Sequence, residues 1–240
     1  MQKTSFDADG RTVTLYSDQA PRILFLQPVD AHDAAALDSQ TQAMASCPLP
    51  FVLAAFQVED WDRDLSPWEA PPVFGKVPFG GGAEKTLCFV TERLLPRLRA
   101  MLPAAEERSL CLGGYSLAGL FSLWAATRTG LFSGVAAASP SVWFPGWLDH
   151  VRAHPLRASA VYLSLGAREE RTKNPLMATV GDCIREQYAL LEQDCAAALE
   201  WNPGNHFKDP ALRTAKAFCW VAGQLSRLPS PACGKGADLL

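Results

Sequence analysis

The sequence predicts an α/β fold in which a mostly parallel, twisted sheet lies between two layers of helices. Short apolar runs alternate with longer helix-forming segments, an order typical of parallel strands joined by covering helices. Several of these runs are apolar without interruption, as expected of strands buried on both faces. The chain has 240 residues, 48% of them hydrophobic, which is enough for one domain with a large core. We therefore expect a single domain over residues 1–240, with a loose tail at 228–240.

The predicted elements follow one another in a regular order. The expected strands are residues 11–16, 22–27, 51–56, 109–113, 134–138, 161–165 and 199–201. The expected helices are residues 34–46, 83–102, 117–129, 174–198 and 209–226. Pro96 should bend or shorten the second helix because proline cannot donate to the preceding turn. Residues 59–82 form a long irregular stretch, and a segment of that kind in a compact domain is usually functional.

Composition argues against several classes of protein. The 22 basic and 25 acidic residues give a net charge of −3, and without a basic tract nothing favours nucleic-acid binding. The apolar runs are too short to span a bilayer, and the residues after Met1 do not form a signal peptide. The seven cysteines lack C-x-x-C spacing and mostly lie in apolar runs, so we expect reduced thiols in a cytoplasmic protein. No cofactor or metal site is expected.

A serine lies where an apolar strand passes directly into a helix. Ser116 stands in Gly114-Tyr-Ser-Leu-Ala118, and a helix-forming segment follows at once. This context is that of a nucleophile elbow, a sharp turn that lifts the serine Oγ above the sheet. Small flanking residues let strand and helix approach closely. The alternative is an ordinary strand-to-helix turn with a capping serine.

A serine nucleophile needs a base, and the chain has four histidines. His206 lies in a turn-rich loop between the last strand and the last helix, which fits the chain order serine, acid, histidine. His32 follows a strand end and is a weaker candidate. His150 and His154, four residues apart, are spaced to pair on a helix, but no third metal ligand accompanies them, which favours a solvated face.

The acid should follow the strand at 161–165. Glu169 and Glu170 both stand just after its closing Gly166, and either one would orient the imidazole of the base and stabilise its charged form. Alternatively, both are solvated partners of neighbouring arginines. Weaker candidates inside the next helix are Asp182 and Glu186.

Backbone donors and aromatic side chains complete the expected site. An oxyanion hole would use the N–H of Leu117, after the nucleophile, and one from the loop after strand 22–27. Pro28 has no N–H, so Val29 is the first choice there. Aromatic residues crowd the predicted mouth and suggest an apolar or sugar-stacking pocket, although each alone could cover the core. They are Trp61, Trp68, Phe79, Trp143, Phe144 and Trp147.

Five segments together resemble the putative-esterase branch of the α/β-hydrolases, which includes trilactone-siderophore esterases, esterase D-like enzymes and mycolyltransferases. They are Arg63-Asp-Leu-Ser-Pro67, residues 114–120, Ala-Ser-Pro-Ser-Val-Trp-Phe at 138–144, Leu-Ser-Leu-Gly-x-x-Glu at 163–169, and Gly204-Asn-His206. The order of elements fits over about residues 10–227. The resemblance implies an α/β-hydrolase fold.

In that family the acid usually stands shortly after the glycine that closes its strand, and the residue three positions past Gly166 is Glu169, which is therefore preferred to Glu170. Ala118 departs from the usual glycine of the elbow, a change that a close-packed turn should tolerate. No lid is inserted between residue 138 and the acid, so a dedicated lipase is not expected.

The leading functional hypothesis is a cytoplasmic serine carboxylesterase acting on a small-molecule ester. Ser116 attacks the ester carbonyl, His206 moves the proton, and water hydrolyses the acyl-enzyme. Two alternatives remain: an acyltransferase with the same triad, and a non-catalytic binding protein with a hydrolase fold.

Overall fold

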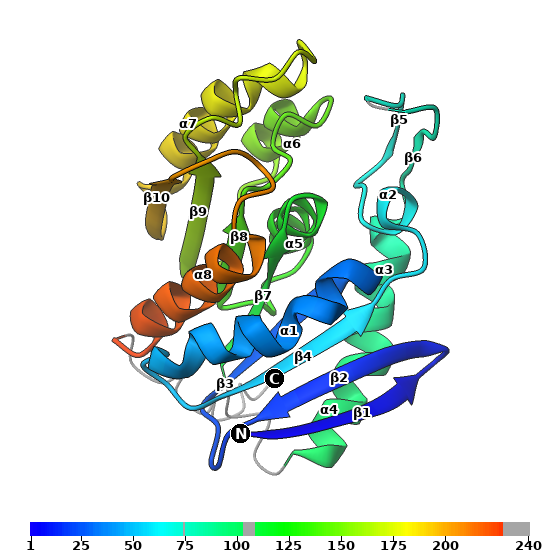
Figure 1. Ribbon diagram of the computed structural model, residues 1–240, viewed down its shortest axis with the longest axis vertical. Helices are drawn as coiled ribbons and strands as arrows, with labels where there is room; N and C mark the ends of the chain where they lie inside the picture. The colour runs from blue at the N-terminus through cyan, green and yellow to red at the C-terminus, as the bar shows by residue number, and fades with distance from the viewer. Residues whose placement is uncertain (74, 103–108, 228–240) are drawn as a thin grey trace, which may run out of the picture.

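An eight-stranded sheet with helices on both faces forms the centre of the molecule (Figure 1). The structure is a computed structural model that describes residues 1–73, 75–102 and 109–227, so the expected tail at 228–240 lies outside the described residues. The strand order is β1-β2-β4-β3-β7-β8-β9-β10. The six strands from β4 to β10 run parallel, and β1 and β2 pair antiparallel at one edge. The expected mostly parallel, three-layer arrangement is confirmed.

All seven expected strands are present in this sheet, which has one more strand among the described residues. The strands are β1 (Gln2–Ala8), β2 (Arg11–Ser17), β3 (Ile23–Val29), β4 (Phe51–Gln57), β7 (Ser109–Tyr115), β8 (Gly134–Ala138), β9 (Ala160–Gly166) and β10 (Ala196–Asn202). β1 escaped prediction because it is an exposed edge strand without an apolar run. Asp9 and Gly10 have φ values of 55° and 81°, as a two-residue hairpin turn between β1 and β2 requires.

Helices cover the two faces of the sheet unequally. They are α1 (Ala31–Ala43), α3 (Ala83–Phe89), α4 (Leu95–Met101), α5 (Leu117–Arg128), α6 (Trp147–Ala153), α7 (Val180–Leu191) and α8 (Pro210–Leu225). On one face α1 and α8 lie together (Figure 1) and bury an aromatic core that includes Phe25 and Phe218. On the other face α3 to α7 cover a second core that includes Leu26 and Leu120.

Two predicted helices differ from the expectation. The helix expected at 83–102 is divided by a π-helical turn at Val90–Leu94, and Pro96 lies in the first turn of α4. The prediction of a helix at 174–198 is wrong at both ends. The helix begins after a 3₁₀ turn, η4 (Met177–Thr179), and stops at Leu191. Residues 196–198 instead extend β10 against β9, so tertiary pairing overrides the helical tendency of these alanines.

The irregular stretch contains little regular structure. A short helix, α2 (Trp61–Asp64), precedes two antiparallel strands, β5 (Glu69–Ala70) and β6 (Phe79–Gly80). Within the described part of the chain, no helix is both long enough and apolar enough to cross a bilayer.

Candidate active site

Ser116 occupies a strained turn between β7 and α5. Its φ is 56° and its ψ is −120°, a conformation that costs a non-glycine residue free energy unless the surroundings enforce it. The enforcement comes from backbone hydrogen bonds. The Ser116 N–H donates to the Ala138 carbonyl at 3.0 Å, and the Ser116 carbonyl accepts from the Ser141 N–H at 3.1 Å. The turn is thereby tied to the end of β8.

The small residues of the elbow are explained by close packing. A Cβ added at Gly114 would lie 2.6 Å from the Cβ of Ala118, so the side chain at position 118 can exist only because position 114 has none. The departure from glycine at Ala118 is thus accommodated within the same turn.

Three predicted side chains lie in one hydrogen-bonded line. His206 Nδ1 lies 2.7 Å from Glu169 Oε2, and His206 Nε2 lies 3.0 Å from Ser116 Oγ. A proton on Nδ1 donates to the carboxylate, which leaves Nε2 as an acceptor for the serine hydroxyl. The elements that supply these residues are the β7–α5 turn, the segment after β9 and the loop after β10. The imidazole is therefore oriented to accept the serine proton.

Glu169 is a buried carboxylate with several donors. Its side chain is only 4% exposed. Its Oε1 accepts from the Gly166 N–H at 2.6 Å, from Ser139 Oγ at 2.8 Å and from Arg213 Nη1 at 2.9 Å. Burial alone would raise the pKa of Glu169, but the hydrogen bond and charge of His206, with the donors at Gly166 and Ser139, hold it below its ordinary value. The carboxylate is therefore ionised at neutral pH.

The other acid candidates lie elsewhere. Glu170 pairs with Arg185 at 3.7 Å, and Asp182 pairs with the same arginine at 2.9 Å. Glu186 forms an exposed ion pair with Arg152. Of the two adjacent glutamates, the structure brings Glu169, which the resemblance favoured, to the imidazole.

The remaining histidines are also accounted for. His32 is exposed in the first turn of α1. His150 in α6 stacks on His154, the residue directly after α6, with ring centroids 4.5 Å apart. The Thr127 hydroxyl lies 3.1 Å from His150 Nε2. Burial, together with the positive charges of His154 and Arg128, lowers the pKa of His150.

Two polar residues near the line were not anticipated. Tyr115 precedes the serine, and its hydroxyl donates to the His206 carbonyl at 2.6 Å. Burial raises the pKa of Tyr115, so the phenol keeps the proton that it donates. Arg213 projects from α8 and is only 3% exposed. A sequence signal for it existed: Arg213 stands four residues before Ala217 and eight before Val221, on the apolar stripe of an amphipathic helix.

The two backbone N–H groups predicted for the oxyanion hole, those of Leu117 and Val29, differ in their orientation toward Ser116. Leu117 is the first residue of α5, so its N–H has no partner within the helix. Val29 ends β3, and its carbonyl accepts from the Val58 N–H at 3.0 Å. In a parallel ladder the N–H and C=O of one residue point to the same neighbouring strand. The Val29 N–H is therefore directed at β4, away from Ser116.

The aromatic candidates divide into core and rim. Trp147 is completely buried, and its Nε1–H donates to Gln187 Oε1 at 2.8 Å, so it belongs to the core and is not offered to a substrate. Trp143 is 8% exposed and contacts Phe79. Trp61 and Trp68 are half-buried. The Trp68 Nε1–H donates to the Pro145 carbonyl at 2.9 Å.

Aromatic rings join the two segments that were expected to meet. The ring centroids of Phe79 and Phe144 are 5.0 Å apart, those of Phe79 and Trp143 are 6.3 Å apart, and those of Trp68 and Phe144 are 5.8 Å apart. These four residues, Trp68, Phe79, Trp143 and Phe144, are called the aromatic cluster below. The cluster connects the irregular stretch 59–82 to the segment after β8.

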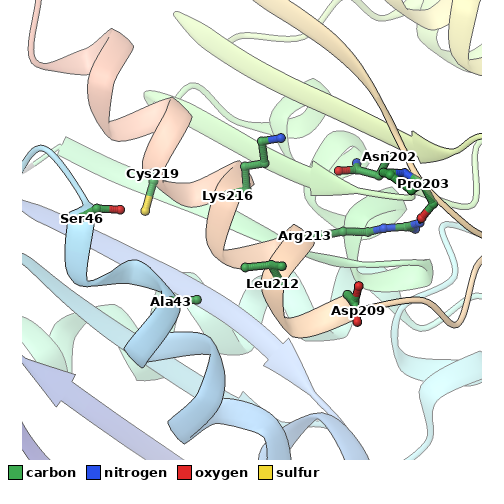
Figure 2. Close-up of a pocket in the computed structure, with 9 residues that line it drawn as sticks. All are labelled: Ala43, Ser46, Asn202, Pro203, Asp209, Leu212, Arg213, Lys216 and Cys219. Atoms are coloured by element: carbon green, nitrogen blue, oxygen red, sulfur yellow. The ribbon is translucent and has the colours of Figure 1, made fainter.

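A cavity of about 540 Å³ opens between α1 and α8, beside the end of β10 (Figure 2). The residues that line it include Ala43, Ser46, Asn202, Leu212, Arg213 and Lys216. Figure 2 shows Arg213 extending from α8 toward Asn202 and Pro203. Arg213, whose guanidinium contacts Glu169, is therefore one of the residues that line this cavity.

The family model described as "Putative esterase" matches residues 28–202. No curated protein sequence matches the chain.

Solved structures share the fold at low sequence identity. The siderophore hydrolase EstB from Aspergillus nidulans is 18% identical, with a TM-score of 0.71 over 90% of this chain and 93% of EstB. An IroE-like serine hydrolase from Shewanella oneidensis is 16% identical, with a TM-score of 0.73 over 91% of this chain and 79% of the other. The enterobactin esterase from Shigella flexneri is 18% identical, with a TM-score of 0.66 over 93% of this chain and 59% of that chain.

Proposed function

Because the chain belongs to the "Putative esterase" family of α/β-hydrolases and is a carboxylic ester hydrolase, we propose that Ser116, His206 and Glu169 form its catalytic triad. One observation carries the proposal. The serine hydroxyl, both imidazole nitrogens and a buried carboxylate form an unbroken line, with contacts of 3.0 Å and 2.7 Å. A serine hydroxyl becomes a competent nucleophile when a positioned base takes its proton, and this line supplies both the base and its orienting acid.

The proposed reaction has two half-reactions. In acylation, Ser116 Oγ attacks the ester carbonyl carbon while its proton passes to His206 Nε2. The tetrahedral intermediate collapses, and the leaving alcohol takes that proton from the imidazolium. In deacylation, His206 takes a proton from water, the resulting hydroxide attacks the acyl carbon, and the protonated imidazole returns the proton to Ser116 as the acid product leaves. Glu169 keeps its charge throughout and stabilises the imidazolium.

The oxyanion would be held by backbone donors. We propose the Leu117 N–H as the first, because it begins α5 and adjoins the nucleophile. For the second donor, the N–H of Val29 is excluded because it faces β4, and the N–H of the next residue is favoured. The Asp30 N–H points to the opposite side of β3, the side on which β7 lies. We therefore propose the Asp30 N–H, instead of the expected Val29 N–H, as the second donor of the oxyanion hole.

The substrate is proposed to be a small-molecule ester. Trp61 and Trp68 are half-buried, whereas Phe79, Trp143 and Phe144 are buried. The two half-buried indoles are therefore the rings offered to a substrate, and flat apolar surfaces of this kind bind acyl chains, sugars or aromatic groups. Neighbouring structures are described as a siderophore hydrolase and an enterobactin esterase, so siderophore esters are the first natural substrates to test.

Hydrolysis measured on the purified protein tests this function. We expect turnover of short p-nitrophenyl esters and, among natural candidates, of enterobactin-type trilactones. Ser116→Ala should leave the fold intact and reduce turnover by about 10⁶-fold, as when a triad serine is removed. A folded Ser116→Ala protein that hydrolyses esters at the wild-type rate would contradict the proposal.

A further inference from the structure

We propose that Arg213 is a positioning residue that fixes the catalytic line by bonding to the carboxyl ends of four consecutive parallel strands. The inference rests on the proposed triad, because it assigns a role within that site. Arg213 comes from α8, after the last strand, and contacts the end of β7 and the segments that follow β8, β9 and β10.

Two contacts hold the acid. Arg213 Nη1 lies 2.9 Å from Glu169 Oε1 and 3.0 Å from Ser139 Oγ. Ser139 follows β8, and its hydroxyl donates to the same carboxylate oxygen at 2.8 Å. Because Oε1 is held in this way, Oε2 is left to face the imidazole. The guanidinium thus fixes the orientation of the carboxylate, so that its second oxygen points at His206 Nδ1.

The other contacts hold the base. Arg213 Nη2 donates to the carbonyls of Pro203 and Asn205, both at 3.2 Å, in the loop that ends at His206. Nη1 also donates to the Tyr115 hydroxyl at 2.7 Å, and that hydroxyl donates in turn to the His206 carbonyl. The loop that carries the base is therefore bound to the same group that binds the acid.

The surroundings are built to admit the guanidinium. A Cβ added at Gly166 would lie 2.7 Å from Arg213 Nη2 and 2.8 Å from Glu169 Oε1. The glycine that closes β9 is thus needed for the arginine–glutamate contact as well as for the turn. Both partners are buried, Arg213 at 3% and Glu169 at 4% exposure. Removing either charge would leave the other buried without its partner, which is costly.

The positive charge of Arg213 should affect the pH dependence of the reaction, which can be measured. The titratable groups that face the guanidinium are Glu169 and Tyr162 from the β9 side, Tyr115 at the end of β7 and His206 after β10. The cation offsets part of the Glu169 charge. Without it, the imidazole would face an uncompensated carboxylate, which favours the imidazolium. In the absence of this cation, His206 would lose its imidazolium proton, and so become able to accept the Ser116 proton, only at a higher pH.

The test compares Arg213→Met and Arg213→Lys with wild type. For each variant, kcat and KM for a p-nitrophenyl ester are measured from pH 5 to pH 9. We expect Arg213→Met to lose about 10²-fold in kcat, the effect of misplacing a catalytic group, with KM little changed. In Arg213→Met, the rise of kcat/KM on the acid side of the pH profile (the acid limb) should occur at a higher pH than in wild type. Arg213→Lys keeps the charge but not the planar fork, so kcat should fall while the limb stays in place.

Lys216→Met is the matched control. It removes a cation one turn later on α8, whose partner is the exposed Glu200, and should leave both kcat and the pH profile unchanged. An unchanged kcat in folded Arg213→Met would overturn the inference. So would an equal loss at every pH without movement of the acid limb, since that result indicates a purely structural role.

A second readout does not depend on turnover or on the Met variant. The Nδ1 proton of His206, bonded to Glu169, should give a downfield proton resonance in wild type, and Arg213→Lys should shift or broaden it. An identical resonance in Arg213→Lys would contradict the role. If wild type hydrolyses no ester, the proposed function fails, whereas active wild type with unaffected Arg213 variants removes only the positioning role.

Discussion

At the scale of single residues, the site depends on groups whose surroundings hold them in unfavourable states. Ser116 keeps a positive φ because backbone bonds from β8 and the 138–141 segment enclose it. Glu169 keeps its charge in a buried position because four donors surround it. Each is a local cost offset by neighbouring contacts, as is common where a protein positions reactive groups.

Exchange of the acid tests the line directly. Glu169→Gln should lower kcat by roughly 10²–10⁴-fold, because an amide can neither fix the imidazole tautomer nor stabilise the imidazolium. Glu170→Gln is the matched control, since Glu170 pairs with Arg185, and its kcat should stay near wild type. Steady-state kinetics of both variants decide the assignment. A larger loss in Glu170→Gln would reverse it.

Glu169 should also influence stability against acid. Its pKa is lowered in the folded protein, so the stabilisation it contributes is present above its unfolded pKa and is lost as the pH falls through the folded value. The wild-type Tm should therefore fall more steeply below about pH 4.5 than that of Glu169→Gln. Thermal melts from pH 7 to pH 3 provide the measurement. Parallel curves for the two proteins would contradict the expectation.

At the scale of elements, the nucleophile depends on how closely β7 approaches α5. Gly114 on the strand and Ala118 on the helix share a space that admits one methyl group. The same logic applies at Gly119, where an added Cβ would lie 3.1 Å from Pro140 Cβ. Small residues therefore set the height of the serine above the sheet.

A compensating pair of substitutions tests this packing. Gly114→Ala should destabilise the protein by about 1–3 kcal/mol, the usual cost of overpacking, and should reduce esterase activity. Adding Ala118→Gly removes the competing methyl group, so the double variant should recover part of both losses. Denaturant unfolding gives the free energies. If Ala118→Gly brings no recovery in the Gly114→Ala background, the two positions do not share the space.

Sequence patterns predicted elements best where one strong signal acts alone. The buried strands follow from uninterrupted apolar runs, and the elbow follows from small residues at a strand–helix junction. β1 was missed because its stabilisation comes from pairing with β2 rather than from burial. The helix expected at 174–198 was too long because the pairing of residues 196–198 with β9 is a non-local contact.

The same reasoning explains the partial prediction of the site. Ser116 and His206 follow from motif and chain order. Glu169 was preferred to Glu170 only through the family resemblance, because local sequence does not determine the turn geometry that separates the two side chains. Arg213 was missed because its partners lie on four separate strand ends. Trp147 was assigned to the pocket because burial of a single indole cannot be deduced from sequence alone.

At the scale of the whole molecule, the parallel strands bring separate segments of the chain to one edge of the sheet. Ser116, Ser139, Glu169 and His206 follow β7, β8, β9 and β10 in turn. Because the carboxyl ends of parallel strands meet at one edge, residues ninety positions apart in the chain come into contact. The expectation of a single domain stays a prediction, although one sheet carries all of these residues.

The proposed triad requires that Ser116, activated by His206, is the nucleophile. Its most direct test is labelling of the folded protein with a fluorophosphonate, followed by mass spectrometry of the modified peptide. The phosphonyl group should be found on Ser116, and labelling should be lost in Ser116→Ala and in His206→Ala but retained in His32→Ala. A label on another residue, or undiminished labelling of either of the first two variants, would contradict the account.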